Sequence, residues 1–211
     1  MPGPIALLFA GLLASGTAFS QSEIRVLERR EIAMPAASSH RLAITLVQLE
    51  DSGWTRERSV RAFAQAMAIL QQCDLGVARA EWLNLSTPSR YLDFSTPVSR
   101  ELARLHPVPR PAIYFVRDTR NRPAFEAEAI GRGNSRARPE LADTVWITAG
   151  TRDPGIALAH ELAHVLMNSG EHSDEPDNLM REDTSGANTR LSVTQCTRMT
   201  KTAQENGLLQ R

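Results

Sequence analysis

The chain has 211 residues, 42% of them hydrophobic and 23% charged, which suits one globular domain with an adequate core and no clear second domain. Lysine plus arginine and aspartate plus glutamate both number 24, so the formal net charge is zero. This balance gives no electrostatic reason to expect nucleic acid or an anionic membrane surface as a partner.

The N-terminal stretch predicts a signal peptide. An apolar run covers residues 5–13, and Ala18 and Ser20 place small residues three and one positions before a cut ahead of Gln21. The run is too short to span a bilayer. We therefore expect residues 1–20 to be removed on export to a periplasm or the cell exterior, with no membrane association afterwards. No lysine or arginine precedes the run, and an N-terminal anchor or a buried strand is the alternative interpretation.

Export to an oxidising compartment makes a disulfide between the cysteines of this chain plausible. The chain has two cysteines, Cys73 and Cys196. In an oxidising compartment two such residues are more often paired than free, so we expect one disulfide between them; two buried thiols are the alternative. Neither has a second cysteine or a histidine at metal-ligand spacing, so the pattern does not predict a structural zinc site.

The elements after the signal peptide follow from periodicity and turn residues. Residues 21–40 are polar, without a sustained period, and are expected to form a partly ordered lead-in rather than a fold element. Patterns of alternating or continuous apolar residues then predict strands at 41–49, 77–85, 112–116, 125–130 and 145–148. Apolar spacings of three and four predict helices at 55–72, 99–105, 153–168 and 192–205. For the third helix, Asp153 is expected to cap free amides and Pro154 to occupy the first position.

That third helix carries the chemistry. His160, Glu161 and His164 spell HExxH, and two imidazoles four residues apart on a helix project from nearly the same face, where they can share one metal ion. Glu161 is one residue on from His160 and therefore projects from the helix in a different direction from the two imidazoles. It is expected to act on a metal-bound water as general base. The alternative is a chance motif on a solvated face. Apolar residues at most positions of this helix disfavour that alternative.

A catalytic zinc site also needs a third protein ligand and an open position. The next imidazole is His172, which follows Gly170 at the expected end of the helix. A chain reversal there would bring a third nitrogen to the metal. A plain surface histidine is the alternative for His172.

The stretch HELAHVLMNSGEHSDEPDNLM, from His160 to Met180, resembles the zinc-binding segment of the metzincins, especially the matrixins. The resemblance implies an α+β fold: a single catalytic domain over residues 41–211, with a twisted mixed sheet, an active-site helix, a Met-turn and a C-terminal helix. It implies His160, His164 and His172 as ligands of one catalytic Zn²⁺, and Met180 as the Met-turn residue beneath the metal. Simple core filling is the other interpretation of Met180.

The chain departs from the family pattern at two positions. Family members have a glycine three residues and a ligand histidine six residues after the second histidine, where this chain has Met167 and Gly170. The third histidine thus comes two residues late. We interpret this as a longer turn in which Gly170 adopts the left-handed conformation.

The predicted function is an exported zinc-dependent peptidase that hydrolyses protein or peptide substrates. The resemblance implies a substrate that lies extended against the edge strand at 125–130. One rival is a zinc hydrolase whose third ligand is Glu182 or Glu205. The other is an exported zinc-binding module or inhibitor without hydrolytic activity. The sequence predicts no nucleic-acid partner and leaves the oligomeric state open.

Overall fold

The computed structural model describes residues 24–35 and 38–210. The signal peptide expected at residues 1–20 lies outside these ranges. Within them, no helix combines the length and the apolar character needed to cross a membrane.

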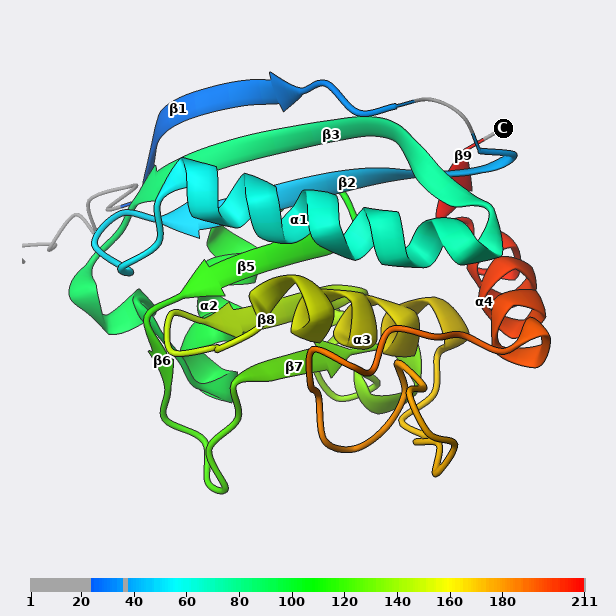
Figure 1. Cartoon of the computed structure of the whole chain (residues 1–211). Helices are drawn as coiled ribbons and strands as arrows, with labels where there is room; N and C mark the ends of the chain where they lie inside the picture. Colours follow the sequence, from blue (N-terminus) through cyan, green and yellow to red (C-terminus); the bar gives the residue numbers. More distant parts are fainter. Residues whose placement is uncertain (1–23, 36–37, 211) are drawn as a thin grey trace, which may run out of the picture.

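The main sheet is twisted and mixed, with strand order β1-β3-β2-β5-β8-β7 (Figure 1). Parallel pairs join β3, β2, β5 and β8, whereas β1 and β7 run antiparallel at the two edges and the short β9 pairs antiparallel with β2. The strand bounds are β1 Arg25–Ile32, β2 His40–Leu49, β3 Leu75–Ser86, β5 Ala112–Val116, β7 Ala127–Ile130, β8 Thr144–Thr148 and β9 Leu209–Gln210. This architecture confirms the α+β expectation.

Four α-helices surround the described part of this sheet: α1 Arg56–Leu70, α2 Thr96–Leu105, α3 Pro154–Met167 and α4 Val193–Glu205. In Figure 1, α1 and α3 lie side by side on one face of the sheet, and α2 lies on the other. Short elements complete the connections: 3-10 helices at Gln71–Cys73, Ser89–Tyr91, Arg132–Asn134 and Pro139–Leu141, and a parallel pair of β4 Asp93–Phe94 with β6 Asp118–Thr119.

The core follows from the alternation of side chains along the central strands. All five residues of β5 and all five of β8 are buried, as expected for parallel strands covered on both faces. Ile113 and Phe115 face the core beneath α1 and α3, whereas Tyr114 and Trp146 stack on the α2 side with ring centroids 4.1 Å apart. The sheet therefore presents a buried apolar surface on which α3 packs.

Two differences from expectation lie near the two ends of the described chain. Residues 25–32, expected to lie in an irregular lead-in, form β1 and pair along most of β3. Residues 209–210 form β9 against Arg41 and Leu42, a strand that was not predicted. In both cases the main chain pairs with a neighbour although the residues show no apolar period of their own.

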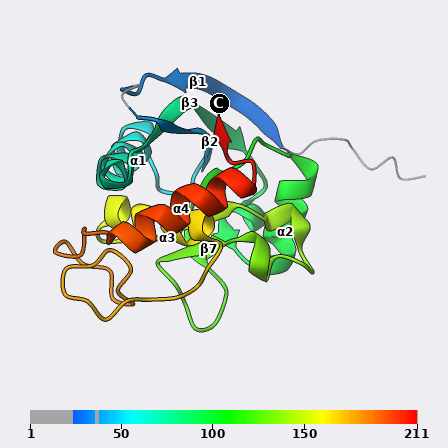
Figure 2. The same cartoon turned by 90° about the vertical axis from the view of Figure 1, so that its right-hand side faces the viewer.

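Cys73 and Cys196 form the disulfide that the cysteine count predicts, with Cα atoms 4.8 Å apart. The bond joins the 3-10 turn after α1 to α4. Helix α4 in turn packs against α3 (Figure 2), so the disulfide closes the side of the core on which the HExxH helix lies.

Candidate metal centre

Helix α3 is buried over almost its whole length, from Gly155 to Met167. Gly155 permits a close approach to α1, because a Cβ at this position would lie 2.3 Å from the Oε1 atom of Gln65. Asp153 stands at the N-cap position as expected, but among the described residues its side chain makes no capping hydrogen bond. Burial between α1 and the sheet, rather than an Asp cap, therefore holds this helix.

The helix ends at a left-handed residue, but that residue is Asn168 and not Gly170. Asn168 has φ 48° and ψ 45°, and its N–H donates to the carbonyl of His164. The expectation that Gly170 takes this role is wrong, since Gly170 has no positive φ. Asparagine tolerates this conformation better than most residues, and here its Oδ1 also accepts a 2.7 Å hydrogen bond from the Gly133 N–H.

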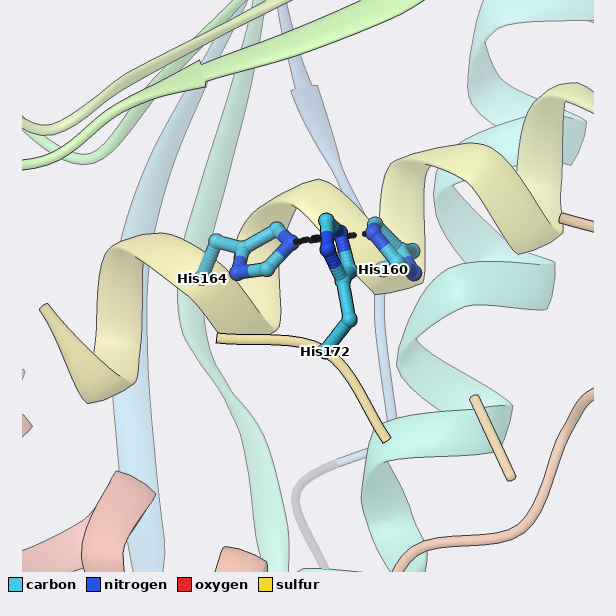
Figure 3. Close-up of side chains that lie close together, drawn as sticks. All are labelled: His160, His164 and His172. Atoms are coloured by element: carbon cyan, nitrogen blue, oxygen red, sulfur yellow. Dashed lines mark hydrogen bonds between the residues drawn. The ribbon is translucent and has the colours of Figure 1, made fainter. Parts of the chain in front are cut away.

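The reversal brings His172 back to the two histidines of the helix (Figure 3). The Nε2 atom of His164 lies 2.9 Å from Nε2 of His160 and 3.3 Å from Nε2 of His172. Nitrogens about 2.0–2.1 Å from one tetrahedral Zn²⁺ lie about 3.3 Å apart, so these spacings suit a single shared ion. Within the described residues, these three histidines form the group with metal-ligand spacing.

Hydrogen bonds orient two of the imidazoles. His160 donates from Nδ1 to the carbonyl of Leu179 at 2.7 Å, and His164 donates from Nδ1 to the carbonyl of Ser169 at 2.6 Å. A carbonyl accepts only, so the proton of each neutral ring is on Nδ1. The Nε2 lone pairs are therefore free to point at the shared position, the usual arrangement for metal-binding histidine.

Burial also favours the neutral, metal-competent form of both rings. Desolvation lowers the pKa of His164 to about 4, with the neighbouring His160 acting in the same direction and the Ser169 carbonyl opposing. The pKa of His160 is lowered mainly by desolvation, and the Leu179 carbonyl opposes this effect. The lowered pKa of each ring favours the neutral form, in which Nε2 has no proton that would compete with a cation.

Glu161 lies beside this cluster, partly buried at the cleft wall. Desolvation raises the pKa of its carboxyl to about 8. The charge of Glu128 on β7 adds to this rise, and the main-chain amide of Ala129 opposes it. A carboxyl whose pKa lies near neutrality suits both the acceptance and the donation of a proton.

An open cleft of about 910 Å³ runs past the histidines. Residues of β7 line this cleft, and so do residues 182–186. His160 and His164 are buried, whereas His172 is exposed, so the point where the three nitrogens meet borders open space. Carboxylates are prominent in the lining: Glu126, Glu128, Asp153, Glu161, Glu182 and Asp183.

The fold is similar to that of a solved structure. One similar solved structure is the crystal structure of metalloproteinase-II from Bacteroides fragilis, with a TM-score of 0.53 and 18% sequence identity. The chain has a metalloproteinase-like fold. The similarity covers 80% of this chain and 55% of that chain, so this chain spans about half of the length of its neighbour. No protein-family model and no curated protein sequence matches the chain.

The metalloproteinase-like fold brings together His160, His164 and His172, and it places Glu161 beside them. Glu182 lines the cleft, and Glu205 is the last residue of α4; neither belongs to the metal-spaced group found in the described residues. Met180 is buried in the core directly after Leu179.

Several supporting groups were not predicted from the sequence: the carbonyls of Ser169 and Leu179, Asn168 and Glu128. A carbonyl acceptor leaves no residue signal. Asn168 was the one of these groups that the sequence could have indicated, because asparagine is the usual substitute for glycine at a left-handed helix end.

Proposed function

We propose that this chain is a zinc-dependent peptidase that binds one Zn²⁺ through Nε2 of His160, His164 and His172. The observation that carries the proposal is the convergence of three imidazole nitrogens at the floor of an open cleft. A structural zinc site is normally closed by four protein ligands, whereas three ligands bordering open space leave a position for water and substrate.

The residues around this position suit hydrolysis of an amide. Zinc bound there supplies the Lewis acidity that activates water and polarises a carbonyl. Glu161, whose ionised form a neighbouring divalent cation favours, accepts the proton of the attacking water and passes it to the leaving amine. The Ala129 amide helps to hold the Glu161 carboxylate in this role.

Strand β7 supports a polypeptide as the substrate. It is the last strand in the sheet order, so its outer edge offers main-chain groups unpaired with any described strand, and it lines the cleft beside Glu161. An extended peptide can pair with such an edge and place one of its carbonyls near the histidines. We therefore propose protein or peptide substrates.

The finer assignment to the metzincins is also a proposal. It is supported by the HExxH helix, the later His172 and the position of Met180 after a loop. In this proposal Met180 forms the apolar floor beneath the metal. The disulfide is compatible with export to an oxidising compartment, as proposed for residues 21–211 after loss of the signal peptide.

The proposal predicts metal-dependent cleavage. Zinc-loaded protein incubated with a diverse peptide library should produce cleavage products detected by mass spectrometry. Removal of zinc with a chelator should abolish them, and restoring zinc should restore them. Absence of cleavage by protein shown to hold one equivalent of zinc would remove the peptidase assignment and favour a zinc-binding module or inhibitor.

Ligand identity is tested separately by zinc affinity. His172→Ala is expected to weaken zinc binding by more than about 100-fold, because loss of a ligand should exceed the roughly 10–100-fold cost of losing a group that merely orients one. Glu205→Ala should leave the affinity unchanged. Chelator competition measures both. Tight zinc retained in His172→Ala and lost in Glu205→Ala would overturn the ligand set in favour of the glutamate rival.

A further inference from the structure

A pair of side-chain amides links the loop beneath the histidines to helix α4. Asn178 donates from Nδ2 to Oε1 of Gln195 at 3.1 Å, and Gln195 donates from Nε2 to Oδ1 of Asn178 at 3.0 Å. Asn178 is only 2% exposed. These two reciprocal hydrogen bonds at a partly buried site fix the Asn178 side chain relative to Gln195, and Nδ2 of Asn178 also donates to Oε2 of Glu175 at 3.2 Å.

The Asn178 end of this pair controls the residue that orients His160. Oδ1 of Asn178 accepts a 2.8 Å hydrogen bond from the N–H of Met180, so the side chain spans Leu179. The N–H of Leu179 donates to the carbonyl of Arg190 at 2.7 Å. Leu179 is thus held on both sides, and its carbonyl is the acceptor for Nδ1 of His160.

The Gln195 end is anchored by the start of α4. Gln195 and the N-cap residue Ser192 form a capping box, in which Oε1 of Gln195 accepts from the Ser192 N–H at 2.8 Å. Cys196, the next residue, carries the disulfide to Cys73. The amide pair is therefore attached to a part of α4 that both a capping box and a disulfide hold.

We propose that Asn178 and Gln195 are positioning residues for the metal centre, which hold the Leu179 carbonyl and through it aim Nε2 of His160. This inference rests on the proposed zinc site. It assigns to the N-terminus of α4 a role in metal affinity as well as in stability. Nothing in the HExxH segment itself contains this link, since Gln195 lies 17 residues beyond Asn178.

Three variants separate positioning from general stability. Asn178→Ala removes the pair and the acceptor for Met180. Gln195→Glu keeps an oxygen for the Ser192 N–H but loses the donor to Asn178. Ser192→Ala is the matched control, because it removes the hydroxyl that accepts from the Gln195 N–H and leaves both amides of the pair in place.

The measurement is the zinc dissociation constant by chelator competition, together with the visible spectrum of the Co²⁺-substituted protein and the thermal midpoint without metal. Asn178→Ala and Gln195→Glu should bind zinc about 10–100-fold more weakly and alter the Co²⁺ spectrum. Ser192→Ala should lower the thermal midpoint with zinc affinity within about threefold of wild type, well below that 10–100-fold range.

Wild-type affinity in both pair variants would overturn the positioning role and leave the zinc site standing. An equal loss in Ser192→Ala and Gln195→Glu would also overturn it, because stability alone would then explain the effect. Failure of the wild type to bind zinc would overturn the proposed function as well. If Asn178→Ala does not fold, Gln195→Glu alone decides, since it retains the capping acceptor.

Discussion

Replacing Glu161 with glutamine is expected to lower peptide cleavage by about 100- to 10,000-fold while zinc remains bound, because general base catalysis contributes about that factor. Glutamine preserves the shape of the side chain and removes its capacity to accept and return a proton. The three histidines are unchanged, so zinc affinity should stay close to that of the wild type.

The same substitution should stabilise the metal-free protein at neutral pH. The pKa of Glu161 is raised from 4.5 to about 8, so this carboxyl does not lower stability below about pH 4.5, where it is protonated in both states, and it destabilises the folded state increasingly as the pH rises from 4.5 toward 8. At pH 7 the folded carboxyl is still mostly protonated, whereas the unfolded one is ionised. Removing this penalty should raise the free energy of unfolding by about 3 kcal/mol at pH 7 and by little near pH 4.5.

Cleavage activity and zinc content test the expected loss of catalysis. Denaturant unfolding in the presence of a chelator tests the expected stabilisation of the metal-free protein. Glu205→Gln is the matched control, since it makes the same chemical change at an exposed position on α4 and should alter none of the three. Undiminished cleavage by zinc-loaded Glu161→Gln would contradict the role of the carboxylate. Equal unfolding free energies for this variant and the wild type at pH 7 would contradict the raised pKa.

Some elements of the site could be predicted from the sequence and others could not. The position of α3 and the approach of His160 to His164 follow from helical periodicity, which the surrounding apolar residues make unambiguous. The meeting with His172 required a chain reversal whose location was misjudged: the left-handed residue is Asn168, because its side chain also bonds the Gly133 amide. That second partner lies on another element and has no sequence signal near the helix.

Strand β1 shows a different limit. Its sequence RVLERREI has six of eight residues exposed and offers no buried face that a pattern could reveal. It is a strand because β3 supplies main-chain partners along its length. The link from Gln195 to Asn178 is likewise a product of tertiary packing: α4 must first lie beside the loop before the two amides can meet.

The disulfide is expected to make the largest single contribution to stability. Its two cysteines are 123 residues apart, and in the chain-entropy model closing a loop of this length stabilises the fold by roughly 5 kcal/mol. The double variant Cys73→Ala, Cys196→Ala should therefore lower the thermal midpoint by about 10–20 °C in a chain of this size. Calorimetry or circular dichroism of the oxidised wild type and the double variant measures the difference.

The wild type unfolded in the presence of a thiol reductant is the matched comparison, because it loses the same bond without a change in packing volume. Both samples should lose stability together, and zinc affinity should fall in both, since Cys196 is adjacent to Gln195 and loosening α4 loosens the support of His160. A double variant with the wild-type midpoint would show that α4 is held by packing on α3 alone. A lowered midpoint with wild-type zinc affinity would separate the stability of α4 from the orientation of His160 and leave the disulfide a purely structural bond.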